Sequence, residues 1–343
     1  MATIKGIWTQ VYQDQSLQCS SQSLSTIGSL ALIFGGELHP REPRDNDVHI
    51  LDLTPTSSDQ DAQKACLRSY VKTSDSPIAR VGTASAVVDG KIYYFSGRGG
   101  VDMAPIDEKG QLWQFDANGT DWSVIHPAND SQPTPEPRSY HCMTSDGKNT
   151  LYLHAGCPTS GRLSDLWSFD VNERKWSQLT SAPGAPRGGT SITFSGSKLY
   201  RMGGFDGKHE LGGEIDIYDV ASDTWAAHTF IPDGKEGPGC RSVGSLLAVD
   251  VHGKPSLITA FGESDPSALG HAGAGNMLPD AWLWDIESMR WSKIVGEEGG
   301  QVPQARGWYA ADAVVVNGKG GIIVQGGLAE DNQRLDDVWV LSF

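Results

Sequence analysis

Lys198-Leu-Tyr-Arg-Met-Gly203-Gly204 is a hydrophobic run that ends in two glycines. An aromatic run that closes on Asp219 follows it, with Trp225 shortly beyond. The same succession occurs six times along the chain, at a spacing of roughly 50 residues, which is typical of a repeat architecture. The glycines that end the six hydrophobic runs are Gly35-Gly36, Gly97, Gly156, Gly203-Gly204, Gly262 and Gly326-Gly327.

This succession predicts the fold. The spacing resembles that of kelch repeats, in which each unit supplies four short strands and cannot bury both of its faces alone. Six such units close radially, so we predict an all-β, six-bladed kelch β-propeller that forms a single domain over residues 1–343. The glycines permit a sharp exit from each inner strand, and the tryptophans fill the space between neighbouring blades.

The two ends of the chain are predicted to meet. The sixth unit ends at Phe343 without an outer strand, and the segment Gly6-Ile-Trp8-Thr-Gln-Val11 has the pattern of that missing strand. We therefore expect the N-terminal strand to complete the C-terminal blade and close the ring, which leaves only short, protected edges.

Composition limits the classes of partner. The formal net charge is −15, from 27 basic and 42 acidic residues, and the chain contains no basic run, which argues against nucleic acid. Residues 1–11 lack the apolar segment of a signal peptide, and no stretch is long enough to span a membrane. The five cysteines are scattered singly, which favours free thiols in a reducing compartment. We expect a cytoplasmic monomer or weak homodimer whose partner is a small molecule.

Five of the six units begin with an arginine at nearly the same place, and a position that repeats in a propeller forms a ring near one mouth. Such arginines commonly tie adjacent blades together through backbone carbonyls. Arg80 and Arg138 belong to units with unusual loops, Arg98-Gly-Gly and Cys157-Pro-Thr-Ser-Gly, so we assign these two to a catalytic anion clamp. The arginines expected to support the blades are Arg187, Arg241 and Arg306.

The residues directly after the glycine exits should face the same mouth. Glu263 is followed at short range by two further potential ligands, Asp265 and His271, and Pro266 and Gly270 favour a curled backbone between them. These side chains can then converge on one divalent metal, so the sequence predicts a metal site of Glu263, Asp265 and His271. The six exit residues are Glu37, Arg98, Cys157, Phe205, Glu263 and Leu328.

Several motifs carry a resemblance to a known family. The chain resembles the plant specifier proteins of glucosinolate breakdown, namely the epithiospecifier, thiocyanate-forming and nitrile-specifier proteins. The resemblance runs nearly end to end and is tightest from Phe261 to Asp337. The motifs are Gly35-Gly36-Glu37-Leu, Glu136-Pro-Arg138-Ser-Tyr-His141, Arg187-Gly-Gly189, Gly296-Glu-Glu-Gly299, Pro303 through Arg306-Gly-Trp308, Val316-Asn-Gly-Lys319, and Gln325-Gly-Gly with Asp336-Asp337.

The resemblance implies a cofactor. The family holds non-haem Fe(II) with a glutamate, an aspartate and a histidine that are each separated by three residues. Glu263 and His271 fall on the first and third of these positions. Ser267 occupies the middle position, and Asp265 is the aspartate that lies two residues before it. The expected cofactor is therefore Fe(II), or another divalent metal, with Asp265 as the third ligand. The alternatives are that water fills the middle position or that the metal site has changed or been lost.

The resemblance also implies a substrate. The family acts on the unstable aglycone that glucosinolates release, and its arginines that contact the substrate's sulfate fall on Arg80 and Arg138. We add Glu37 and Trp308 to the substrate-binding residues. The hypothesis is a specifier-like, Fe(II)-dependent lyase or isomerase that redirects a reactive, anionic, sulfur-containing intermediate.

Two alternatives stay open at this point. One is a non-catalytic kelch interaction module, and the other keeps the fold and the metal but acts on an unrelated biosynthetic intermediate. No BTB or F-box segment accompanies the repeats, so we expect an enzyme.

Overall fold

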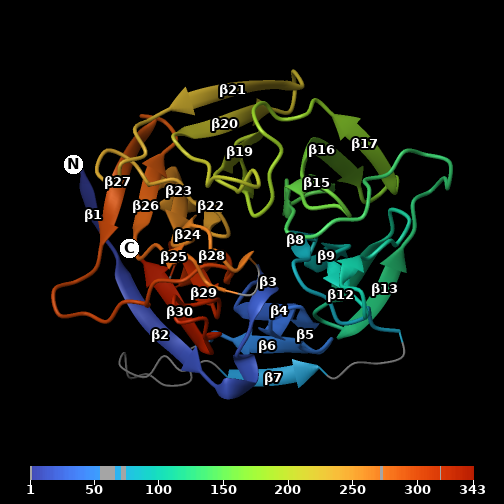
Figure 1. Cartoon of the computed structure of the whole chain (residues 1–343), viewed down its shortest axis with the longest axis horizontal. Coiled ribbons are helices and arrows are strands. Elements are labelled where there is room, and N and C mark those ends of the chain that lie inside the picture. Colours follow the sequence, from blue (N-terminus) through green and yellow to red (C-terminus); the bar gives the residue numbers. More distant parts are fainter. Residues whose placement is uncertain (1, 55–65, 71–74, 271–272, 317) are drawn as a thin grey trace.

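The chain forms a ring of six β-sheets around a central axis (Figure 1). The computed structural model describes residues 2–54, 66–70, 75–270, 273–316 and 318–343. Within these residues the helical structure is one short 3₁₀ turn, η1 (Gln15–Leu17). The prediction of an all-β, six-bladed propeller is confirmed.

Each blade consists of four antiparallel strands that run from the axis outward. Blade 1 contains β3 (Ser20–Ile27), β4 (Leu30–His39), β6 (Val48–Asp52) and β7 (Cys66–Tyr70), and blade 2 contains β8 (Ala84–Val88), β9 (Lys91–Phe95), β12 (Leu112–Asp116) and β13 (Asp121–Ile125). Blade 3 contains β14 (Cys142–Ser145), β15 (Thr150–Gly156), β16 (Leu163–Asp170) and β17 (Lys175–Leu179), and blade 4 contains β18 (Ser191–Ser195), β19 (Lys198–Met202), β20 (Glu214–Asp219) and β21 (Thr224–Thr229). Blade 5 contains β22 (Ser245–Val251), β23 (Lys254–Ala260), β26 (Ala281–Asp285) and β27 (Arg290–Val295), and blade 6 contains β28 (Ala310–Val316), β29 (Lys319–Gln325), β30 (Asp337–Ser342) and β2 (Ile7–Gln13).

The N-terminal segment closes the ring. Strand β2 pairs antiparallel with β30, with Trp8 opposite Leu341, as the sequence predicts. The structure adds a contact that the sequence did not indicate, because β1 (Thr3–Lys5) pairs parallel with β27 of blade 5. Gly6 joins the two strands, and a Cβ atom at this position would lie 2.7 Å from the Leu341 side chain. The segment therefore joins blades 5 and 6.

Aromatic side chains fill the space between the blades. Trp122 of blade 2 packs against Phe34 of blade 1, with their ring centroids 5.1 Å apart. Trp176 of blade 3 lies against Phe95 of blade 2 in the same way, at 5.6 Å. Each such ring contributes on the order of 2 kcal/mol when it leaves water. The predicted role of the tryptophans is confirmed at these two interfaces.

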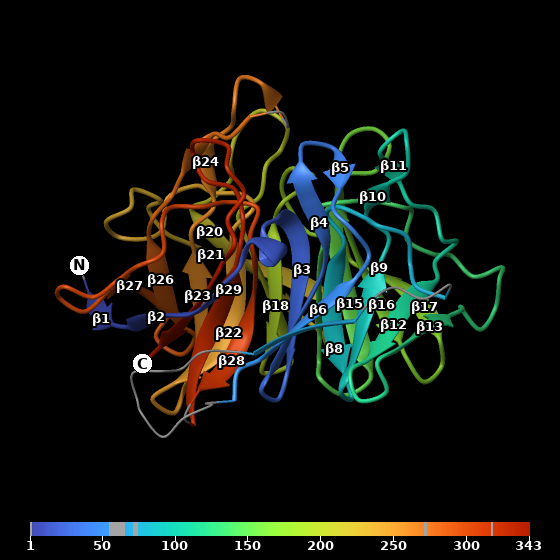
Figure 2. The same ribbon diagram turned by 90° about the horizontal axis from the view of Figure 1, so that it is seen from below.

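Short hairpins gather at one end of the central channel (Figure 2). They are β5 (Glu42–Pro43) beside β4, the pair β10 (Arg98–Gly99) and β11 (Ala104–Pro105), and the pair β24 (Glu263–Asp265) and β25 (Asn276–Met277). The loops that differ between the six units therefore surround one mouth. In the described part of the chain, no helix is long and apolar enough to cross a membrane.

Candidate functional site at one mouth of the channel

A closed belt of backbone hydrogen bonds lines the channel below this mouth. Each blade contributes one residue, and its N–H donates to the carbonyl of the corresponding residue in the preceding blade, at 2.7–2.9 Å. All six residues have φ between 46° and 62°, the left-handed region that costs a residue with a side chain about 1 kcal/mol or more. The belt residues are Ser21, Gly82, Tyr140, Gly189, Val243 and Trp308.

Two belt residues form a floor for the mouth. Tyr140 and Trp308 come from opposite blades, and their rings meet edge to face with centroids 5.2 Å apart. The neighbouring belt residue Gly82 leaves space for this arrangement, because a Cβ atom there would lie 2.8 Å from the Tyr140 ring. The large belt side chains therefore narrow the channel at this level.

The residues after the glycine exits form the walls above the floor. Each pairs with the residue before a belt residue, as Glu263 does with Ser242 and Leu328 with Gly307. All six line one of two adjoining cavities, so the prediction that they share one mouth is confirmed. The two cavities share Tyr140, Cys157, Gly273 and Trp308.

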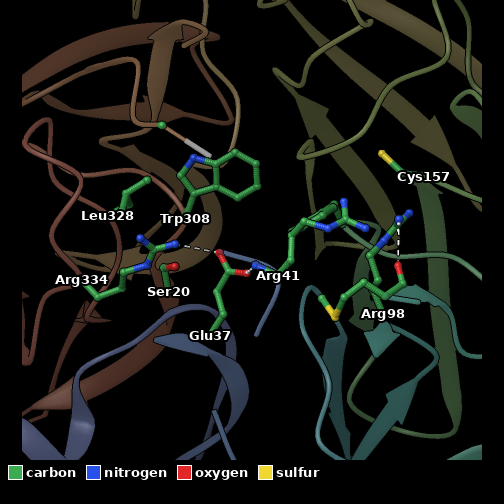
Figure 3. Close-up of a pocket in the computed structure, with 11 residues that line it drawn as sticks. Ser20, Glu37, Arg41, Arg98, Cys157, Trp308, Leu328 and Arg334 are labelled. Carbon is green, nitrogen blue, oxygen red and sulfur yellow. Dashed lines mark hydrogen bonds and ion pairs between the residues drawn. The ribbon is translucent and has the colours of Figure 1, made fainter. Parts of the chain in front are cut away.

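The smaller cavity, of about 70 Å³, is rich in arginine (Figure 3). We call it the arginine chamber and define it by Glu37, Arg41, Arg98, Leu328 and Arg334. Nη2 of Arg334 donates to Oε1 of Glu37 at 3.0 Å, while Oε2 of Glu37 accepts from the backbone N–H of Arg41 at 2.8 Å. Three arginines and one glutamate line the chamber, so its lining carries net positive charge.

Arg98 is held at one side of the arginine chamber. Its Nε donates to the Ser139 hydroxyl and its Nη1 to the Met103 carbonyl, both at 3.1 Å. Neither acceptor is charged, so the positive charge of this guanidinium is not neutralised by these two contacts. A guanidinium with this environment suits a bound anion.

The larger cavity, of about 410 Å³, has a mixed lining. We call it the wide chamber and define its apolar side by Phe205, Val243, Pro266 and Ala268. Its basic and acidic side chains are Arg162, Lys208 and Glu263. A ligand with an apolar group and a charged end would therefore find partners in the two adjoining chambers.

Glu263 and Cys157 have environments that favour their neutral forms. Glu263 is 5% exposed, and burial raises the pKa of its carboxyl above the usual value, although Oε1 accepts a hydrogen bond of 2.7 Å from the Gly275 N–H. Burial likewise raises the pKa of the Cys157 thiol, and Arg162 and Arg98 offset this only in part. Cys157 is thus a thiol rather than a nucleophilic thiolate near neutral pH.

The predicted anion clamp lies elsewhere. Arg80 and Arg138 are completely buried, and each forms a two-point ion pair, with Glu108 and Asp165 respectively, at 2.6–3.1 Å. Arg306 makes the same contacts with Asp337. Neither Arg80 nor Arg138 lines the chambers, and their assignment as anion ligands stays a prediction. We call these pairs, together with Arg241–Asp280, the arginine clasps.

The other predicted site residues lie as follows. Glu37 and Trp308 line the arginine chamber, and Glu263 lines the wide chamber. Asp265 is exposed and lines neither of them, and His271 lies outside the described residues. Within the described ranges, no three His, Cys, Asp or Glu side chains form a group that could hold a metal ion. The predicted ligand set therefore stays untested.

Sequence reasoning missed most of the cations at this mouth. Arg41, Arg162 and Arg334 come from loops that differ between the units, so no repeated position pointed to them. Arg98 could have been assigned, because it is itself one of the six exit residues that the repeat pattern places at this mouth.

Comparison with known proteins agrees with this architecture. Residues 21–262 match the model of the KLHDC2/KLHL20/DRC7 Kelch-repeats domain. The chain is also 30% identical over 370 aligned positions to the N-(sulfonatooxy)prop-2-enimidothioate sulfolyase of Thlaspi arvense, which covers 99% of this chain and 98% of that protein. The chain belongs to the kelch-type specifier family.

Other relatives of this specifier-family protein share the repeats over part of their length. The Kelch-like protein terF of Aspergillus terreus is 27% identical over 75% of this chain and 52% of its own. Kelch domain-containing protein 10 of Homo sapiens is 26% identical over 64% of this chain and 48% of its own. The solved structure of YjhT has the same fold, with a TM-score of 0.69 at 15% identity and coverage of 96% and 95%.

Proposed function

We propose that this protein is a metal-dependent lyase that binds a small, reactive anion with a sulfonatooxy group and directs its breakdown. The observation that carries the proposal is the pair of adjoining chambers, one with three arginines and one with an apolar side. The name of the Thlaspi relative describes a lyase reaction on such a compound, and that relative aligns with nearly the whole chain.

In this proposal the arginine chamber holds the leaving group. When a sulfonatooxy group leaves, the bond between nitrogen and oxygen breaks and its electron pair departs with the sulfate. Negative charge therefore grows on the oxygen that faces Arg98 and Arg41. Fixed donors aimed at the place where charge develops are among the largest contributions to catalysis. Glu37 positions Arg334 through their ion pair of 3.0 Å.

The remainder of the substrate occupies the wide chamber. Phe205 and Val243 offer an apolar surface to its side chain, and Trp308 lies between the two chambers. Holding both ends of one molecule fixes the orientation of the reacting bonds, which can lower the barrier by several kcal/mol.

A divalent metal, Fe(II) first, belongs to the same proposal. Glu263 fits such an ion, because it is a buried carboxylate on the wall of the wide chamber. His271 and Asp265 are the other ligands expected from the sequence, and carboxylate–imidazole sites suit non-haem iron. The metal would supply a Lewis acid or an anchor for the sulfur atom of the substrate. We further propose that the protein acts in the cytoplasm as a monomer or weak homodimer.

The test is product analysis with a freshly released aglycone. We expect the protein with Fe(II) to shift the products from isothiocyanate toward nitrile, measured by gas chromatography. Chelator-treated protein provides the control. If neither preparation changes the products of this or other sulfonatooxy substrates, the non-catalytic interaction module becomes the better description.

A further inference from the structure

Another cavity, of about 320 Å³, lies in the channel on the far side of the floor, and the proposed function does not use it. The innermost strand of every blade contributes to its wall, with residues that follow the belt residues by three to five positions along the chain. Figure 2 shows the inner strands β8 and β28 extending away from the hairpins of the mouth. We call this cavity the far chamber and define it by Thr26, Ser85, Ser145, Thr193 and Asp312.

Asp312 gives the far chamber its charge. Among the described residues of the wall, it is the one acidic side chain, and no basic side chain accompanies it. The backbone N–H groups of Thr26 and Ala313 donate to its two carboxylate oxygens at 2.7 and 2.8 Å, which fixes the orientation of the carboxylate. A carboxylate can accept about four hydrogen bonds, so Asp312 keeps acceptor capacity for a ligand. The far chamber therefore suits a cation, in contrast to the arginine chamber.

The hydroxyl groups of the wall are acceptors as well. The Ser145 hydroxyl donates to the Val87 carbonyl, and the Thr26 hydroxyl donates to the Ala313 carbonyl at 2.7 Å, the shorter of its two contacts. A hydroxyl whose proton is used in this way presents its lone pairs to other partners. The wall thus offers acceptors more than donors. A primary ammonium group matches this lining, because it has three N–H donors and no acceptor.

Apolar side chains distinguish the kind of cation. Val87, Phe194 and Leu247 come from blades 2, 4 and 5 and are only partly buried, and each lines the far chamber. An inorganic cation gains nothing from such a surface, whereas an alkyl chain leaves water when it contacts it. The volume of about 320 Å³ is within the range of small-molecule pockets. The lining therefore favours an organic cation over a metal ion.

We propose that the far chamber binds a small alkylammonium compound, with its charged nitrogen at Asp312 and its alkyl chain against the apolar part of the wall. This site lies on the other side of the Tyr140–Trp308 floor from the arginine chamber and has the opposite charge. The inference therefore goes beyond the proposed function and does not depend on it. The two ends of the channel then select ligands of opposite charge.

The test is isothermal titration calorimetry with n-butylammonium chloride at pH 8 and constant ionic strength. A primary amine is protonated at this pH, and Asp312 is ionised, because burial raises the pKa of its carboxyl only to about 6. We expect saturable binding of one molecule per chain. Methylammonium should bind more weakly because it lacks the alkyl chain, and 1-butanol, which lacks the charge, should not compete.

Three variants locate the ligand. Asp312→Asn should weaken binding by roughly tenfold or more, the scale of one charged hydrogen bond. Thr144→Leu keeps the carboxylate and enlarges a side chain of blade 3, across the ring from Asp312, so it should weaken binding by filling the chamber. Asp89→Asn is the matched control, because it removes an exposed acid from the turn between β8 and β9, and it should bind like the wild type.

Thermal melts of all three variants accompany the titrations, because Asp312 also joins blade 6 to Thr26 of blade 1. Weaker binding in folded Asp312→Asn and Thr144→Leu, with Asp89→Asn unaffected, supports the site. The proposal is overturned if the wild type does not bind n-butylammonium, or if folded Asp312→Asn binds it with wild-type affinity. If Asp312→Asn does not fold, unchanged affinity in Thr144→Leu overturns it equally. Displacement of n-butylammonium by K⁺ or Mg²⁺ at the same ionic strength would show an inorganic-cation site instead.

Discussion

Arginines occur in two regions of this propeller, and their surroundings differ. In the arginine clasps the guanidinium is almost completely buried and paired with an acid of the same blade, as in Arg138–Asp165. In the arginine chamber the guanidiniums of Arg41 and Arg98 face a cavity, and the acceptors bound by Arg98 are uncharged. The clasps occur in four of the six blades, whereas Arg98 is the only arginine among the six exit residues and Arg41 comes from a loop that differs between the units. In this fold the repeated arginines belong to the scaffold, and the arginines that occur once belong to the candidate site.

The largest expected effect comes from breaking a clasp. Arg138→Ala leaves Asp165 without its buried partner, so we expect a loss of about 3–5 kcal/mol in the free energy of unfolding. Urea denaturation with the wild type as reference measures this. Arg80→Ala should behave alike, because it leaves Glu108 unpaired. If Arg80→Ala lost activity but kept the wild-type stability, the catalytic role predicted from the sequence would be supported. Arg80 would then not belong to the scaffold.

A chamber arginine should show the opposite behaviour. Arg98→Gln removes a charge that faces the cavity, and we expect anion binding to weaken by roughly 1.5–3 kcal/mol, the usual range for a charged hydrogen bond. The melting temperature should change little, because Arg98 is only half-buried. Steady-state kinetics and a thermal melt on the same preparation check both parts. A large drop in melting temperature would place Arg98 with the scaffold instead.

Gly82 of the belt packs against the Tyr140 ring in the floor of the mouth, and a substitution there tests how tightly the two are packed. Gly82→Ala puts a Cβ atom 2.8 Å from the ring of Tyr140, and we expect a loss of about 1–3 kcal/mol from overpacking. Gly90→Ala is the matched control, since Gly90 has a similar φ of 70° but nothing within 4 Å of the added atom. The difference between the two variants in urea isolates the contact with the floor. Equal losses would mean that the backbone conformation alone is responsible.

The smallest expected effect concerns Asp312, an acid that does not belong to an arginine clasp. Asp312 accepts hydrogen bonds from Thr26 and the Ala313 N–H, and burial raises the pKa of its carboxyl to about 6. Because the folded-state pKa lies above the unfolded value, the stabilising contribution is complete below the unfolded pKa and is lost as the pH rises through about 6. The stability of the wild type relative to Asp312→Asn should therefore fall between pH 4 and pH 7. A difference that does not vary with pH would contradict the raised pKa.

Physical reasons explain what the sequence predicted and what it did not. The glycine exits and the Trp8 segment predicted blades and ring closure, because strand exits and inter-blade packing depend on local residue types. The blade-supporting role predicted for Arg241 and Arg306 agrees with their buried ion pairs, whereas Arg80 and Arg138 were separated from the others on the basis of their loops and of the family resemblance. The acid partners Asp165 and Asp337 each lie two residues before a tryptophan and could have been recognised as a second repeated position, whereas Glu108 lies five residues before Trp113 and departs from this spacing.

The site was less predictable than the fold. Glu37 and Trp308 follow repeated landmarks, so their position at the mouth could be anticipated. Arg334 reaches Glu37 from a blade whose residues are 297 positions away in the chain, and no local pattern encodes such a contact.

The belt of six hydrogen bonds has no first or last member. The chain begins and ends in adjoining parts of the ring, since Ile7 lies opposite Ser342 in the blade that both termini build (Figure 1). Linking the two ends of this chain and reopening it at another exposed turn would therefore leave every belt contact in place, in the manner of a circular permutant. The cyclic order of the blades would stay the same, and any of several turns could serve as the start of the same ring.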